Sequence, residues 1–207
     1  MSGFRYYMLN TPQGLLSACA DRTRPTVMEC FPPELRVGLN PVGRIDKDTE
    51  GFLILTDDGM LDQRLLRTER HVRKEYEFYA CGRLGEAEFA RLSAGVALEG
   101  SGYRTRPCET ILLPPQTIGS CEAFLPQFRK SRFLKNPHRP VTHGILYLTE
   151  GRKHQVKLMV KAMGGHVFWL RRHAIGPVRL DPALQPGQYR ALFPQELEAL
   201  LQTEEKS

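Results

Sequence analysis

The feature that most constrains how this chain folds is an uninterrupted apolar segment at residues 51–56, with the sequence GFLILT. A polar stretch at residues 43–50 precedes this segment, and the turn-forming sequence DDG at residues 57–59 follows it. An apolar run of this length between turns is typical of a strand that is buried on both faces. The sequence therefore predicts a strand with protein packed against both of its sides.

The rest of the pattern mixes strands and helices. A stripe of apolar residues at helical spacing, including Val156, Met159 and Val160, predicts a helix over residues 152–163. Because strands and helices do not alternate strictly, the pattern favours an α+β fold over a doubly wound parallel sheet. The irregular stretch at residues 100–140 is expected to connect two lobes. Further strands are predicted at residues 5–9, 74–80, 144–149 and 166–175, and further helices at residues 86–94 and from Pro194 onward.

Composition excludes several classes of protein. The 207 residues are 41% hydrophobic and 25% charged, which is typical of a globular protein and not of a disordered one. No apolar run reaches the ~18 residues that a membrane-spanning helix needs, and no secretory signal is recognised at the start, so we expect a cytoplasmic protein without a membrane partner. The five cysteines form no C-x-x-C pair, which favours reduced thiols. Cysteine and histidine also lack the short spacings of a zinc site, so no metal is expected.

The charge of the chain favours a polyanionic partner. Lys and Arg number 29 against 23 Asp and Glu, a formal net charge of +6. Basic residues that neutralise phosphates release counterions, so such an excess is typical of proteins that bind nucleic acids. Between residues 129 and 179 the only acidic residue is Glu150. The second half of the chain is therefore expected to present a positive face.

The densest polar cluster, at residues 43–50, allows three interpretations. In the first, acidic side chains occupy positions 1, 3, 5 and 12 of an EF-hand calcium loop, although the strand-like segment that follows argues against a helix–loop–helix unit. In the second, Asp46 is a catalytic carboxylate that Arg44 and Lys47 keep ionised. In the third, the cluster is a solvated loop with surface ion pairs. The calcium ligands of the first interpretation would be Asp46, Asp48, Glu50 and Asp57.

Residues 43–59, GRIDKDTEGFLILTDDG, closely resemble the signature G-R-L-D-x-x-T-E-G-L-L-L-L-T-N-D-G of the RsuA-type ribosomal RNA pseudouridine synthases. Three further segments match this family in the expected order, and the resemblance extends from residue 5 to about residue 198. Four ordered motifs are far more specific than any one of them. The three segments are residues 9–14 with 24–27, the K-x-Y segment at 74–76 and the E-G-R-x-x-Q-V-[RK]-x-M segment at 150–159.

The resemblance implies a fold and an activity. It implies the α+β pseudouridine synthase fold, with a mixed, largely antiparallel sheet in two lobes and an RNA-binding cleft between them. We expect a single catalytic domain over residues 1–207, with lobes at 1–60 and 61–207 and without the N-terminal S4 module of many relatives. The family isomerises uridine to pseudouridine in structured RNA. No external group or redox change takes part, so no cofactor is implied.

The resemblance also implies roles for four residues. Asp46 is the catalytic carboxylate, acting as a nucleophile or as a base on the ribose. Tyr76 matches the tyrosine that packs against the target base and assists loss of the C5 proton, although a core aromatic of a strand would fit the pattern equally. Lys157 matches the cation that pairs with the aspartate, or it belongs to a solvated lysine stripe. Arg44 matches the arginine that fills the gap left by the flipped-out nucleotide, or it forms a plain ion pair.

Other basic residues are predicted to bind RNA. Arg129, Lys130 and Arg132 form a basic loop that is expected to track phosphates, and Phe133 beside them is available for stacking. The same loop could equally be a solvated linker. At the start of the predicted helix, Arg152 and Lys153 are added as RNA contacts, although Lys153 also fits a solvated stripe with Lys161.

The expected partner is ribosomal RNA, naked or in an assembly particle, and the expected state is a monomer. Thr11 stands where the family usually has Lys, and Leu158 stands where relatives often have Arg, so two positive charges are missing. The motifs do not identify the target uridine or the ribosomal subunit. Two alternatives stay open: a non-catalytic RNA-binding or ribosome-assembly factor, and an acid/base enzyme that acts on a small phosphorylated substrate.

Overall fold

The computed structural model describes residues 3–61, 72–100 and 102–202. The chain divides into two compact units, which we call the first unit (Met1–Lys74 with Arg172–Ser207) and the second unit (Glu75–Arg171). This division corrects the predicted lobes at 1–60 and 61–207, because the C-terminal part of the chain returns to the first unit. The apolar side chains of Ile175, Val178 and Leu200 pack there around strand residues from the beginning of the chain.

The sheet of the first unit is built around one long strand, as the apolar segment predicts. Strand β3 pairs antiparallel with β1 on one side, where Met8 lies opposite Ile54. The short strand β2 also pairs antiparallel with β3, and β12 pairs with the other edge of β1. The bounds of these strands are Tyr6–Thr11 for β1, Asn40–Val42 for β2, Glu50–Thr56 for β3 and Tyr189–Ala191 for β12.

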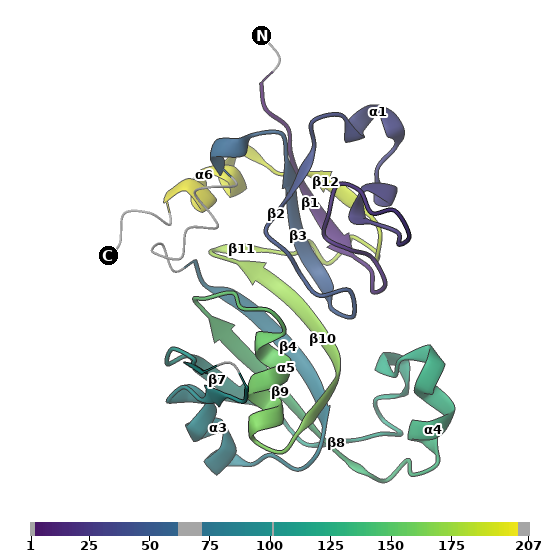
Figure 1. Ribbon diagram of the computed structural model, residues 1–207, viewed down its shortest axis with the longest axis vertical. Helices are drawn as coiled ribbons and strands as arrows, with labels where there is room; N and C mark the ends of the chain where they lie inside the picture. The colour runs from purple at the N-terminus through teal and green to yellow at the C-terminus, as the bar shows by residue number, and fades with distance from the viewer. Residues whose placement is uncertain (1–2, 62–71, 101, 203–207) are drawn as a thin grey trace. The chain divides into compact units, whose positions relative to one another are not determined.

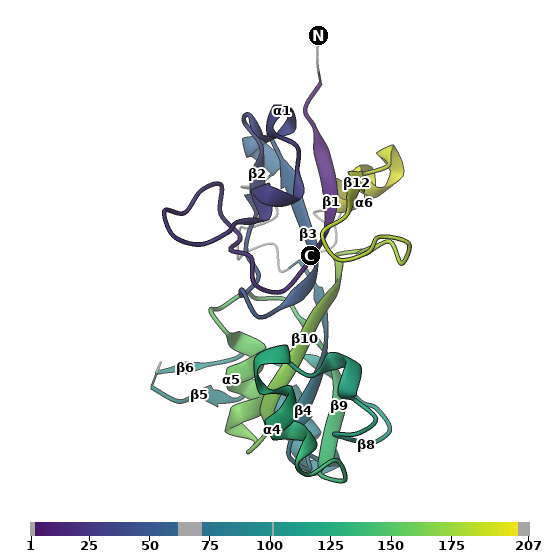
Figure 2. The ribbon, with the colours of Figure 1, turned by 90° about the vertical axis from the view of Figure 1, so that its right-hand side faces the viewer.

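Covering layers bury both faces of β3. Phe52 and Ile54 pack in one cluster with Leu200 of helix α6 (Pro194–Gln202). Leu53 and Leu55 point to the other face, where they pack against the 3₁₀ helix η1 (Val27–Cys30) and its neighbours. Figures 1 and 2 show α6 and the short helix α1 (Pro33–Arg36) on opposite sides of β1 and β3. The side chains of residues 52–55 are completely buried, which confirms the predicted strand.

Within the second unit, the strands of the sheet lie in the order β10-β4-β9-β7. Strand β9 pairs with β7, where Leu146 lies opposite Thr110, and also with the short strand β8. Strand β10 runs on past the end of this unit into the first unit, where β11 pairs with its last residues. The bounds are Lys74–Cys81 for β4, Glu109–Leu112 for β7, Gln116–Thr117 for β8, Pro140–Leu148 for β9, His166–Ile175 for β10 and Val178–Arg179 for β11.

Two different layers cover this sheet. On one face, Phe78 and Leu146 pack against helices α3 (Glu86–Ser93) and α5 (Gln155–Ala162). The short strands β5 (Ala97–Leu98) and β6 (Tyr103–Arg104) lie beside α5 (Figure 2). On the other face, Tyr79 and Trp169 pack against residues 118–134. That layer consists of η3 (Glu122–Phe124), η4 (Gln127–Arg129) and α4 (Lys130–Leu134), which Figure 1 shows across β10 from α3 and α5.

The irregular stretch at residues 100–140 therefore does not connect two lobes, as its composition suggested. It belongs wholly to the second unit, because Ile118, Cys121 and Leu125 are buried against the sheet of that unit. All five cysteines are free thiols. Within the described parts of the chain, no helix is both long and apolar enough to cross a membrane.

Candidate active site

The loop that carries Asp46 lies in the first unit, between β2 and β3. Two glycines with positive φ bound it, Gly43 at 68° and Gly51 at 104°, a backbone region in which other residues are strained. Within the loop, the amide of Thr49 donates a 2.8 Å hydrogen bond to the carbonyl of Asp46, which closes a tight turn. Asp46 is half-buried and Arg44 is exposed. The glycines of the signature are thus explained by the turn that presents the carboxylate.

Contacts from elsewhere in the first unit hold this loop. The hydroxyl of Ser17 donates to the carbonyl of Ile45 and accepts from its amide, both at 3.1 Å. The buried guanidinium of Arg172 donates to the carbonyl of Phe52 at 2.7 Å and to that of Arg44 at 3.4 Å. A loop whose backbone is bound at both ends is suited to fixing a functional side chain. Sequence reasoning missed Ser17 and Arg172, because no local pattern links either residue to the loop.

Lys74, the first residue of the K-x-Y segment, is a partly desolvated cation of the first unit. Its ammonium donates a 3.0 Å hydrogen bond to the carbonyl of Val72. Burial, together with the nearby charge of Arg172, lowers the pKa of Lys74 from 10.5 to about 8. The side chain therefore carries a positive charge that the fold destabilises at neutral pH.

The calcium interpretation of the cluster is wrong in this structure. Asp57, its twelfth ligand, accepts hydrogen bonds from the amide and the Nε of Arg5, both at 2.7 Å. Although burial opposes the shift, these bonds and the charge of Arg5 hold the pKa of Asp57 below its usual value. The loop also lies between two strands, not two helices. Across the described ranges, no group of three or more Asp, Glu, His or Cys side chains is placed to hold a metal ion.

Tyr76 and Lys157 lie in the second unit. Tyr76 is a half-buried residue of β4 and packs against the cluster around Phe78. Lys157 is half-buried on α5, whereas Lys161 on the same helix and Lys153 in the turn before it are exposed. Lys161 is paired with Glu99 at 3.7 Å. The three lysines of the predicted stripe are therefore not equivalent, and exposure separates Lys157 from the other two.

The E-G-R-x-x-Q segment forms the turn that leads into α5. The carboxylate of Glu150 accepts hydrogen bonds from the side-chain amide of Gln155 at 2.6 Å, from the backbone amide of Arg106 at 3.0 Å and from the hydroxyl of Tyr103. The guanidinium of Arg152 lies 3.1 Å from the centre of the Tyr103 ring, a cation–π contact. Glu150 and Gln155 thus fix the start of the helix that carries Lys157, which begins at Gln155 and not at residue 152 as predicted.

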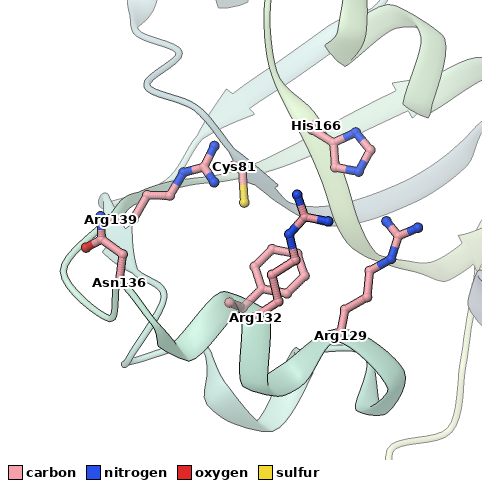
Figure 3. Close-up of a pocket in the computed structure, with 7 residues that line it drawn as sticks. Cys81, Arg129, Arg132, Asn136, Arg139 and His166 are labelled. Atoms are coloured by element: carbon pink, nitrogen blue, oxygen red, sulfur yellow. The ribbon is translucent and has the colours of Figure 1, made fainter.

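The basic loop of the second unit separates into two kinds of residue. The ammonium of Lys130 pairs with Glu122 at 3.0 Å. Arg129 and Arg132 instead line a cavity of about 530 Å³, which we call the arginine pocket. Sequence reasoning placed neither Arg139 nor His166 with them. The lining of the arginine pocket is Cys81, Arg129, Arg132, Phe133, Asn136, Arg139 and His166 (Figure 3).

Known structures identify the class of this fold. One solved structure, titled "Crystal structure of pseudouridylate synthase", is 32% identical, has a TM-score of 0.78 and matches 97% of this chain and 75% of its own. The human RNA pseudouridylate synthase domain containing 1 is 16% identical with a TM-score of 0.57, over 98% of this chain and 94% of its own, and shares the fold. The α+β fold with a largely antiparallel sheet is that of the pseudouridylate synthases, as the sequence predicted.

Sequence relatives identify the family. Residues 5–162 match the family described as RNA pseudouridylate synthase. The Bacillus subtilis "Uncharacterized RNA pseudouridine synthase YtzG" is 41% identical over 198 residues, which are 95% of this chain and 73% of the relative. The Escherichia coli "Ribosomal small subunit pseudouridine synthase A" is 30% identical over 199 residues, 96% of this chain and 75% of the relative. The chain belongs to the RNA pseudouridylate synthase family, as an RsuA-type member, and is an isomerase that converts uridine to pseudouridine in RNA.

Proposed function

We propose that this enzyme isomerises uridine in ribosomal RNA and that Asp46 is its catalytic carboxylate. The observation that carries the proposal is the held loop at residues 43–50, which presents a half-buried aspartate between Gly43 and Gly51. Ser17 and Arg172 bind the backbone of this loop, so the backbone from which the Asp46 side chain extends is held in place. A reaction at the anomeric carbon requires a carboxylate in a defined position.

The chemistry assigns a task to each residue. The bond between C1′ of the ribose and N1 of uracil breaks, C1′ bonds to C5, the proton leaves C5 and N1 takes up a proton. Asp46 acts at the sugar as a nucleophile or as a base, and Lys157 is the cation that keeps this carboxylate ionised. Tyr76 packs against the uracil and assists the loss of the C5 proton. The atoms balance without a redox partner or an external group.

Arg44 is proposed to replace the extruded uridine in the RNA. Taking a base out of its stack costs on the order of a few kcal/mol, and a planar guanidinium that stacks and donates hydrogen bonds offsets part of that cost. The exposed position of Arg44, two residues before Asp46 in the same loop, supports this role. Arg152 and Lys153, both exposed near the start of α5, are proposed to contact RNA phosphates.

Ribosomal RNA is the proposed substrate because several relatives, including the Escherichia coli one, are named ribosomal small subunit pseudouridine synthase A. The positive charge of residues 129–179 supports an RNA partner. A cytoplasmic location follows from that substrate, and a monomeric state stays a prediction.

The proposal is tested with unmodified RNA from both ribosomal subunits, naked and in particles, followed by carbodiimide labelling and primer extension. The wild type is expected to modify a defined uridine, and Asp46→Asn is expected to lower the rate by more than about 1,000-fold. Asp48→Asn removes the same charge two residues away and is expected to retain activity. Binding without modification by the wild type would favour an assembly factor. Activity of Asp46→Asn equal to that of the wild type would reject the assigned carboxylate.

A further inference from the structure

The arginine pocket lies within the second unit, on the sheet face covered by η4 and α4. Arg129 ends η4 and Arg132 belongs to α4, whereas Arg139 comes from the turn before β9 and His166 begins β10. In Figure 3 the side chains of Arg132 and Arg139 reach toward Cys81 from different sides, and Arg129 reaches toward His166. Segments far apart in the sequence thus direct cationic groups into the arginine pocket.

None of the described residues that line this pocket is acidic. In the described part of the chain, the side chains of Arg132, Arg139 and His166 form no hydrogen bond or ion pair with another side chain. Glu122, an acidic residue of the layer at residues 118–134, is already paired with Lys130. Like charges that converge without a counter-ion repel one another, so the arrangement is favourable only when an anion enters.

The volume of the pocket and the residues that line it restrict which anion it can bind. A volume of about 530 Å³ exceeds what a single phosphate group needs and lies within the range of about 300–1,000 Å³ that is typical of sites for small organic ligands. Cys81 is buried at the wall, and Phe133 packs its ring 5.4 Å from that of Phe168. Phe133 therefore supports the pocket wall, which restricts the stacking role predicted for it. An apolar wall beside guanidinium groups suits a phosphate with its attached sugar.

We propose that the arginine pocket binds one backbone phosphate of the RNA substrate together with the adjoining ribose. Arg132 and Arg139 donate paired N–H groups to the phosphate oxygens, a geometry to which guanidinium is well matched. Arg129, His166 and the side-chain amide of Asn136 complete the donor set. The site uses none of the residues assigned to the isomerisation, so it positions the RNA and does not take part in the chemistry. The inference rests on the proposed function, because it takes RNA as the substrate.

The test measures RNA affinity against salt concentration in the Asp46→Asn background, in which binding does not depend on turnover. The double variant Arg132→Gln/Arg139→Gln is expected to weaken binding by about 10- to 30-fold at low salt and to lower the salt slope by about 1, because both side chains contact the same phosphate and each lost phosphate contact removes about one unit. Arg91→Gln is the control for the loss of a positive charge elsewhere on the second unit. It removes one charge, against two in the double variant, from α3 on the opposite face of the sheet, and is expected to change affinity by less than about 2-fold.

Phosphate-ethylation interference then identifies the contact. Ethylation of one defined phosphate is expected to weaken binding by the parent protein and to have no added effect on the double variant. Thermal unfolding of each variant confirms that the fold is intact.

The possible outcomes separate the two proposals. If the double variant binds RNA as the parent does, or if Arg91→Gln has the same effect, the pocket inference is wrong while the proposed function stands. If the wild type binds RNA through this pocket and yet modifies no uridine, the proposed function fails and the pocket stands. Absence of RNA binding by the parent rejects both.

Discussion

Arg190 of the first unit and the pocket arginines of the second unit carry the same guanidinium in opposite surroundings. Arg190 donates to Asp181 at 2.7 Å and, with two nitrogens, to Glu196 at 2.8 Å each. The hydrogen bonds to Glu196 and Asp181 raise the pKa of Arg190 above its usual value, although burial opposes the shift. Arg132 and Arg139 form no such pair with any described residue.

The difference shows how a basic chain divides its charges between stability and binding. Arg190 joins β12 to α6 and to the turn at Asp181, so its partners lie within the fold. The pocket arginines also sit at fixed places in the fold, on η4, on α4 and in the turn before β9, but their partners must come from outside. The net charge of the chain does not distinguish Arg190 from the pocket arginines, whereas the positions of the carboxylates around each of them do.

The largest effect is expected from removal of the paired arginine. Arg190→Ala should lower the free energy of unfolding by about 2–3 kcal/mol, because a bidentate, half-buried ion pair is lost and its carboxylates stay without their cation. RNA affinity of the folded variant should change by less than about 2-fold. Urea denaturation and RNA titration check the two values. A loss of stability no greater than that of the exposed control Arg91→Ala would break the comparison.

Lys74 tests the opposite case, a half-buried cation whose described hydrogen-bond partner is a backbone carbonyl. Its pKa of about 8 lies below the value of the unfolded chain, so the unfolded state binds more protons above pH 8. The free energy of unfolding should therefore rise as the pH increases from about 8 to about 10.5. Below pH 8 the folded state carries the full cost of keeping the desolvated ammonium charged.

Lys74→Met should accordingly raise the free energy of unfolding at pH 7 by on the order of 2 kcal/mol and flatten this pH dependence. Denaturation at several pH values measures both effects. If the variant is less stable than the wild type at pH 7, the bond from Lys74 to Val72 outweighs the desolvation of the charge.

Removal of two pocket arginines should change the free energy of unfolding less than removal of Arg190 does, and in the opposite direction. Arg132→Gln/Arg139→Gln should leave the free energy of unfolding within about 0.5 kcal/mol of the wild-type value or raise it slightly, because repulsion between unpaired cations is relieved. Differential scanning calorimetry at low salt, where repulsion is least screened, is the sharpest measurement. A loss of more than about 1 kcal/mol would mean that these side chains hold the fold.

Local patterns predicted the parts of the molecule that depend on near neighbours. The apolar run of β3 and the stripe of α5 were visible because each repeats at the period of its own element. The turn with Asp46 was marked by glycines, whose positive φ no other residue adopts easily. The motif resemblance placed the candidate residues without their surroundings.

Long-range contacts could not be predicted in the same way. Arg172 binds the carbonyl of Phe52 across a separation of 120 residues, and nothing in its own neighbourhood marks it as part of that loop. Arg139 and His166 meet Arg132 only because β9 and β10 belong to one sheet. Composition indicated a positive second half, but it could not show that Lys130 is paired while Arg132 is not.

The difference between the paired Lys130 and the unpaired Arg132 in the described part of the chain leads to the smallest expected effect, which is on RNA binding. Lys130 must give up its 3.0 Å pair with Glu122 before it can bind a phosphate, whereas Arg132 has no such pair to break. Lys130→Gln should therefore weaken RNA binding by less than about 3-fold, against about 5-fold for Arg132→Gln alone, and should lower stability by no more than about 0.5 kcal/mol because the pair is partly exposed. Parallel titrations at low salt compare the two variants. Equal losses would show that overall charge, and not the absence of an internal partner, determines which basic residues bind the RNA.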